Sequence, residues 1–154
     1  MNKPAQIRAV LEAALPYLKR DPENLLVFIE NGRVASSLGR RGWEYRYTVT
    51  VGLLDFAGHP DTVILPLLDW IRSSEPALLQ NRDSSEKAIE FEAEIRNNRT
   101  CDLMLKIPLT ERVMIDVEEG ITRANHIDEP CMMPTVDRLQ VYLKGDLIYD
   151  SRPA

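Results

Sequence analysis

Apolar side chains in the first twenty residues recur every three or four positions, which is the spacing of one face of an α-helix. They are Ile7, Val10, Leu11, Ala14, Leu15 and Leu18. Pro4 suits the first turn of such a helix, where no backbone N–H is needed, and Pro16 is expected to kink or end it. The same spacing predicts a second helix, which Asp61 or Thr62 would cap and Glu75-Pro76 would close. Its apolar face is Val63, Ile64, Leu67, Leu68 and Ile71.

Elsewhere the period changes to two, which predicts half-buried β-strands. Alternating runs begin at Trp43, at Ile89 and at Cys101. The second run predicts an inward set and an outward set, respectively Ile89, Phe91, Ala93 and Ile95, and Glu90, Glu92, Glu94 and Arg96. Pro108 indicates that the third strand lies at a sheet edge or leaves its ladder there, because proline cannot donate a ladder hydrogen bond.

Shorter segments complete the predicted order of elements. Leu25–Glu30 is a predicted strand, and Asn31-Gly32 favours a tight hairpin turn that would send residues 33–37 back beside it. Residues 121–135 show no repeat and are predicted to form a long irregular excursion. Residues 139–149 predict a terminal hairpin that turns at Gly145-Asp146.

Runs of strands separated by single helices predict an α+β fold, with a mainly antiparallel sheet and two helices packed on one face. A length of 154 residues predicts one domain, over residues 1–154. The segment Met1–Arg8 is polar and charged, and no apolar run approaches the ~20 residues of a membrane helix. We therefore expect a protein of the cytoplasm that does not cross a membrane.

The charge balance narrows the classes of partner. Nineteen Lys and Arg stand against twenty-four Asp and Glu, so the net charge is −5. This balance argues against a protein that binds nucleic acid through a broad basic field, although local basic loops remain possible.

The sequence offers little chemistry for catalysis or metal binding. It contains two histidines and two cysteines, His59, His126, Cys101 and Cys131, without any paired metal-binding spacing. Neither a phosphate-binding glycine loop nor a nucleophile elbow is present. We expect no enzyme, no metal and no cofactor; the remote alternative is a small enzyme that uses His59 or His126 with a nearby carboxylate.

Two groups of charged residues are candidates for an interface. Glu90, Glu92 and Glu94 form an acidic stripe on one strand face, and Arg40 and Arg41 lie between two glycines in a predicted loop, with Arg33 before it. In the simplest interpretation, both groups are solvent-exposed surface with no binding role. In the sharper interpretation, the acidic stripe faces a basic loop of a neighbouring subunit or a lumen through which an anionic polymer passes, and Arg40 and Arg41 touch phosphate.

Several short segments resemble the tail completion R proteins of temperate, contractile-tailed bacteriophages. The resemblance runs from residue 1 to about Val113 and rests on the order and combination of its segments. They are the Asn-Lys-Pro start within Met1–Arg20, Glu-Tyr-Arg-Tyr-Thr at 44–48, Asp-Phe-Ala-Gly at 55–58, Leu-Leu-x-Trp at 67–70, Gln80-Asn81, Phe-Glu-Ala-Glu-Ile at 91–95 and Leu-Thr-Glu-Arg-Val at 109–113.

The resemblance implies a small α+β subunit that assembles as a ring, commonly six-fold, on the head-proximal end of the tail tube. Such a ring stops tube growth and prepares the surface that joins the head. The implied partners are other copies of the chain, tail tube and sheath proteins, and the head-tail connector, with DNA passing nearby and no sequence-specific binding of it. A head-side connector or stopper, or an assembly protein absent from the finished particle, is the alternative within the same class.

Overall fold

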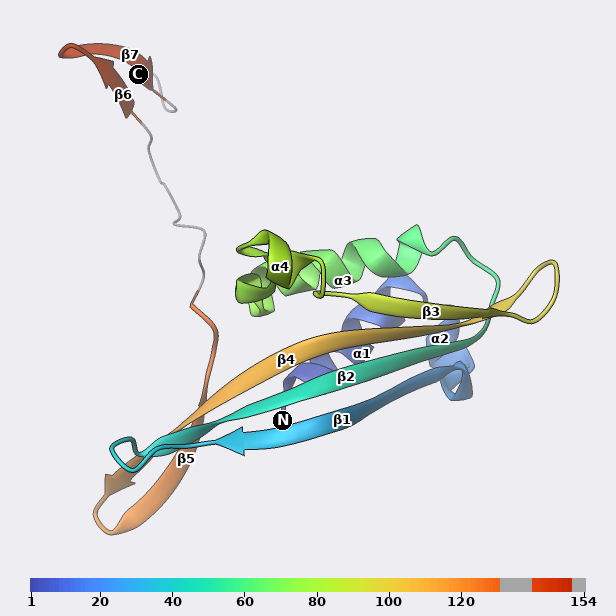
Figure 1. Cartoon of the computed structure of the whole chain (residues 1–154), viewed down its shortest axis with the longest axis horizontal. Helices are drawn as coiled ribbons and strands as arrows, with labels where there is room; N and C mark the ends of the chain where they lie inside the picture. Colours follow the sequence, from blue (N-terminus) through green and yellow to red (C-terminus); the bar gives the residue numbers. More distant parts are fainter. Residues whose placement is uncertain (131–139, 151–154) are drawn as a thin grey trace.

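A five-stranded antiparallel sheet is the centre of the computed structural model, which describes residues 1–130 and 140–150 (Figure 1). The strands run in the order β1-β2-β4-β3, and β5 also pairs with β4. Their bounds are Leu25–Ala35 (β1), Gly42–Phe56 (β2), Glu90–Ile95 (β3), Cys101–Glu118 (β4) and Ile121–Ile127 (β5). The predicted α+β class with a mainly antiparallel sheet is confirmed.

Two long helices pack against one face of this sheet. Their bounds are Lys3–Ala14 (α1) and Asp61–Ser74 (α3). Shorter helical turns connect the elements: Tyr17–Arg20 (α2), Arg82–Ser85 (α4), Pro22–Asn24 (η1) and Pro76–Leu79 (η2). As predicted, Pro16 follows the end of the first helix, and α3 ends just before Glu75-Pro76.

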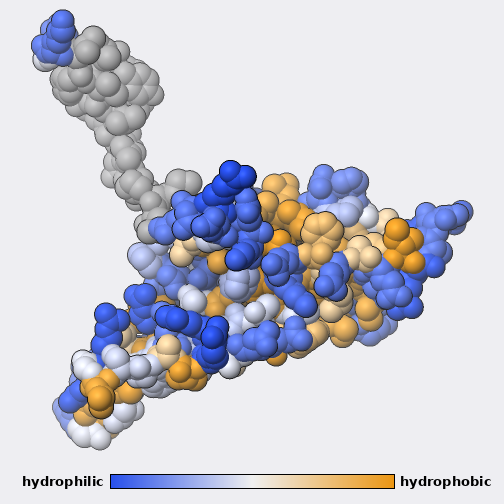
Figure 2. Space-filling model, viewed as in Figure 1, coloured by the Kyte–Doolittle hydropathy of each residue, from blue (hydrophilic) through white to orange (hydrophobic). Residues whose placement is uncertain are grey.

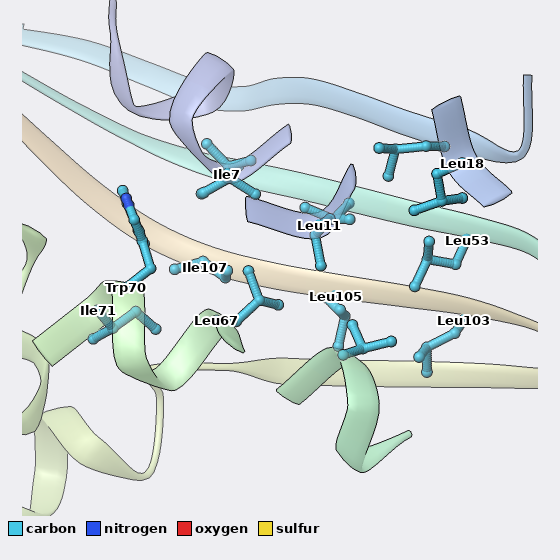
Figure 3. Close-up of a cluster of buried hydrophobic side chains, with 14 of the residues drawn as sticks. Ile7, Leu11, Leu18, Leu53, Leu67, Trp70, Ile71, Leu103, Leu105 and Ile107 are labelled. Atoms are coloured by element: carbon cyan, nitrogen blue, oxygen red, sulfur yellow. The ribbon is translucent and has the colours of Figure 1, made fainter. Parts of the chain in front are cut away.

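The core lies between α1, α3 and the odd-numbered residues of β2 and β4. Ile7 and Leu11 of α1 and Leu67 and Ile71 of α3 are fully buried there, and Figure 3 shows them gathered over Leu105 and its neighbours. Burying one such side chain contributes about 1.5–3 kcal/mol. The sheet residues of this core are Tyr47, Val49, Val51, Leu53, Leu103, Leu105, Ile107 and Leu109.

The predicted hairpin turn at Asn31-Gly32 is wrong. Strand β1 continues to Ala35, and its register against β2 shifts between Glu30 and Arg33. Asn31 has φ +54°, so the dipeptide supplies the left-handed conformation to a bulge within one strand instead of to a turn. The chain reverses later, in the loop between β1 and β2.

Two further expectations fail beside β4. Phe91 and Ile95 pair with Leu105 and Cys101 and so share the helix-covered face, but they are 66% and 80% exposed. The alternation predicts the face of each residue correctly, yet the helices do not extend over this edge strand. Residues 121–127, predicted as irregular, form β5, and residues 131–135 of the predicted excursion lie outside the described residues.

The terminal hairpin has the predicted position. Gln140–Leu143 (β6) pairs with Asp146–Asp150 (β7) in a separate two-stranded sheet. Over the described ranges, 1–130 and 140–150, the helices are too short or too polar to cross a bilayer.

Candidate functional site

A hollow lined by arginines lies at one end of the sheet, where β1 turns into β2. It encloses about 640 Å³ between the loop residues 36–42 and neighbouring parts of β2 and β4. Its basic lining residues are Arg40, Arg41, Arg46 and Arg112, and we call it the arginine hollow. The sequence identified Arg40 and Arg41; the strand register adds the other two.

Close backbone contacts fix the loop of the arginine hollow. The Ser36 hydroxyl donates to the Gly42 carbonyl at 2.8 Å, and the Ile115 amide donates to the Arg41 carbonyl at 3.3 Å. Gly42 has φ +142°, and a Cβ there would lie 2.2 Å from the Val113 carbonyl oxygen. Only glycine fits this approach of β2 to β4, so Gly42 sets the direction in which the two loop arginines leave the sheet.

Positive charge in the arginine hollow is incompletely neutralised. The Arg46 Nε lies 2.6 Å from a Glu44 carboxylate oxygen, whereas Arg40, Arg41 and Arg112 form no ion pair within residues 1–130 and 140–150. The buried indole N–H of Trp43, which also lines the hollow, meets no acceptor in the described part of the chain. Arg33 does not line the hollow. It occupies the position opposite Arg46 in the register of β1 against β2.

The acidic stripe is on β3, near the other end of the sheet. Glu90, Glu92 and Glu94 are all exposed and pair in register with Lys106, Met104 and Asp102. Residues directly opposite on a ladder share a face, so the stripe lies on the face that the helices leave open. Arg46 and Arg112 lie on this same open face, because they occupy the even-numbered ladder positions of β2 and β4.

A buried ionic network, which the sequence analysis missed, joins the helices to β4. The Glu111 carboxylate accepts hydrogen bonds from the backbone amides of Asn2 and Lys3 at 3.0 and 3.1 Å, and from the Tyr47 hydroxyl. The His126 Nδ1 lies 3.2 Å from the same carboxylate. Asn2, the residue before α1, provides no side-chain cap, so Glu111 caps the helix from across the fold.

Lys3 and Glu75 close a gap in the sheet between β3 and β5. Both strands pair with the same edge of β4 and leave residues 107–111 unpaired on that edge. The Lys3 Nζ binds the Glu75 carboxylate and the Thr110 carbonyl, the latter at 2.6 Å, while the Thr110 hydroxyl donates to Glu75 at 2.9 Å. Pro108 brings no N–H to this gap, in agreement with the prediction that it lies at an edge.

Burial and hydrogen bonding shift the pKa values of the Glu75 and Glu111 carboxyl groups in opposite directions. Burial raises the pKa of Glu75, and its bonds to Lys3 and Thr110 do not fully offset this effect. Burial also acts to raise the pKa of Glu111, but the Tyr47 hydroxyl and the two backbone amides outweigh it, so that this pKa is lowered overall. Glu111 is therefore held as the anion that caps α1.

We predict that Glu111→Gln lowers the free energy of unfolding by about 1–3 kcal/mol at pH 7, because it loses the charge-assisted cap. A lowered pKa stabilises the fold above the ordinary value of 4.5 and loses that contribution as the pH falls through the lowered pKa. The difference from the wild type should thus shrink in acid. Urea denaturation between pH 7 and pH 3 measures it.

Glu75→Gln is the matched control, because the raised pKa of Glu75 gives its contribution to stability the opposite pH dependence. Its contribution to stability is present below pH 4.5 and is lost as the pH rises through the raised pKa. The loss of stability in Glu75→Gln should therefore grow as the pH falls from 7 to 3, whereas the loss in Glu111→Gln shrinks. The same trend with pH in both variants would contradict the opposite pKa shifts.

Catalysis finds little support in this network. His126 and Glu111 do form a pair, but the carboxylate is already committed to three structural hydrogen bonds. His59 is exposed and accepts a hydrogen bond from the amide of Asp61 at 3.2 Å. Within the described ranges, no three His, Cys, Asp or Glu side chains are grouped to hold a metal ion.

Comparisons with known proteins agree on one family. The family model of P2 phage tail completion protein R (GpR) matches residues 1–130. Tail completion protein R of Escherichia phage P2 is 33% identical over 150 residues, which cover 96% of this chain and 97% of the relative. The similarity therefore extends beyond Val113, where the recognisable segments of the sequence end. No solved structure matches the chain.

Proposed function

The chain belongs to the P2 phage tail completion protein R (GpR) family, and on that basis we propose that it caps the head-proximal end of the tail tube. A phage tail completion role and a place in the virion tail follow from the family. The finer proposal is a ring, commonly of six copies, that stops tube growth and prepares the surface that joins the head. The proposed partners are further copies, tube and sheath proteins, and the head-tail connector, with assembly in the cytoplasm of the bacterial host.

The observation that carries the proposal is the family match over residues 1–130. The surface of the sheet supports it in physical terms. A ring needs two different surfaces on each subunit, because a head-to-tail contact repeated around an axis closes on itself. The arginine hollow and the acidic stripe are two such surfaces, and we propose Arg33, Arg40, Arg41, Glu90, Glu92 and Glu94 as interface residues. We further propose that residues 1–154 act as one tail-terminator domain.

Deletion of the gene from the phage, followed by electron microscopy of the tails, tests the proposal. We expect tubes of uncontrolled length, because nothing stops their growth, and restoration of normal length when the wild-type chain is supplied from a plasmid. Normal-length tails that fail to join heads would contradict a terminator and favour the connector or stopper alternative.

The same assay tests the remote enzyme alternative. A plasmid that carries His59→Ala and His126→Ala together should restore tail length as the wild type does, provided that the variant accumulates as folded protein. Loss of tail completion by a folded double variant would support the enzyme alternative.

A further inference from the structure

We propose that the arginine hollow binds strand β3 of a second copy of this chain, so that copies associate head to tail. The inference deepens the proposed ring and rests on it for its biological setting. The chemistry on both sides is explicit: guanidinium groups of Arg40, Arg41 and Arg112 receive the carboxylates of Glu90 and Glu92. Arginine suits this role because its planar group can donate two parallel hydrogen bonds to one carboxylate.

The position of the two charged groups favours contact between copies over contact within one copy. Along β4, the arginine hollow lies at Arg112 and the acidic stripe at Lys106, which are about 20 Å apart at the usual rise of a strand. The Debye length is about 8 Å at physiological salt, so these groups barely neutralise each other within one chain. Each end is therefore left with a surface that a complementary partner can satisfy.

The two groups are also accessible on the same chain. All six residues of β3 are exposed, and β3 is an edge strand whose outer side pairs with no strand among residues 1–130 and 140–150. Glu90 and Glu92 form no ion pair in that part of the chain. Neighbouring carboxylates on one face of a strand stand roughly 6.6–6.8 Å apart, so two of them can reach separate guanidinium groups.

Exposed apolar side chains accompany the acidic end of the open face. Leu26 and Phe28 of β1 are 41% and 42% exposed there, and Phe28 is in register with Thr50, Lys106 and Glu90. Figure 2 shows hydrophobic side chains at the surface between hydrophilic ones. Apolar side chains beside charged ones are the usual composition of a protein interface.

A second copy satisfies these features better than nucleic acid does. DNA would be attracted to the arginines but repelled by the acidic stripe on the same open face and by the net charge of −5. A second copy supplies a negative surface for the positive one and the reverse. Because the complementary groups lie at opposite ends, a pair joined head to tail still has one free hollow and one free strand, and it can grow.

Charge reversal tests the inference on the purified, full-length chain. The variants are Arg40→Glu with Arg41→Glu, and Glu90→Lys with Glu92→Lys. We expect each one alone to weaken self-association about 100-fold or more, since like charges then face each other. Mixing the two variants should restore association, because a reversed hollow meets a reversed strand. Sedimentation velocity and native mass spectrometry over a range of concentrations measure the species formed.

Matched controls separate a specific contact from a change of net charge. Lys19→Glu with Arg20→Glu replaces two neighbouring, exposed cations of α2 and changes the net charge by as much as Arg40→Glu with Arg41→Glu does. This control should associate as the wild type does. Raising NaCl from 0.05 to 0.5 M should weaken association of the wild type and of this control alike. Circular dichroism confirms that each variant is folded.

Four results would overturn the inference. Three concern self-association: a wild type that stays monomeric at every concentration, a closed dimer that grows no further, and a mixture of the two variants that fails to associate. The fourth is that Arg40→Glu with Arg41→Glu loses DNA binding while its self-association is unchanged. A strict monomer that still completes tails would overturn this contact and leave the proposed function standing.

Discussion

Replacement of Lys3 by methionine is expected to lower the free energy of unfolding by about 3–5 kcal/mol. Methionine keeps the length of the side chain and removes its charge, which leaves the Glu75 carboxylate, only 4% exposed, without its cation. The Thr110 carbonyl loses its donor as well. A buried charge left alone costs far more than the pair contributes, because water no longer solvates it.

Chemical denaturation at pH 7 measures this loss, with Lys19→Met as the matched control. Lys19 is exposed and should change stability by less than about 0.5 kcal/mol. The cost of Lys3→Met should fall in acid, since protonation of Glu75 removes the unpaired charge. Adding Glu75→Met should recover part of the loss, but the amide and carbonyl of Thr110 would stay unsatisfied. A loss no greater than that of Lys19→Met would contradict the role of the pair.

Gly42→Ala is expected to cost about 2–3 kcal/mol and to displace the loop that carries Arg40 and Arg41. The new Cβ would lie 2.2 Å from the Val113 carbonyl oxygen, and alanine would be held at φ +142°, which L-residues rarely adopt. The clash is with backbone, so no side chain can move aside. We therefore expect the ladder to open where β2 begins.

Hydrogen exchange at one amide reports this change directly. The Ile115 amide donates to the Arg41 carbonyl, so its protection should be lost in Gly42→Ala. Gly39→Ala is the control in the same loop, because a Cβ there meets nothing within 4 Å. That variant should keep both its stability and the protection of Ile115. Full protection in Gly42→Ala would show that the loop can relax without opening the ladder.

Local patterns predicted the elements better than they predicted what covers them. Alternation from Trp43 to Leu53 identified β2, and helical spacing identified α1 and α3, because each buries one continuous face. The same reasoning placed Phe91 and Ile95 inward, although the helices end short of that edge. Whether a strand residue is buried depends on how far the helix layer extends over the sheet, and the sequence of the strand alone does not determine this extent.

The candidate site was only partly visible in the sequence. Arg40 and Arg41 stand out because they are adjacent, whereas Arg112 joins them through the register of β4 against β2. The buried network brings together residues that are 72 and 108 positions apart. One signal was present: Glu111 continues the inward odd-numbered series of β4, and a carboxylate at such a position requires buried donors.

The cap that Glu111 provides has a consequence for the order in which the chain folds during synthesis. Lys3 leaves the ribosome 108 residues before Glu111 does, which at about 5–20 residues per second is a delay of roughly 5–20 seconds. Throughout that time the first helix lacks its cap and the β4 residues that complete its core, although β2 and α3 are made earlier. An isolated helix of twelve residues is marginal in water, so the first helix depends on these partners and gains its full stability only after Glu111 has been made.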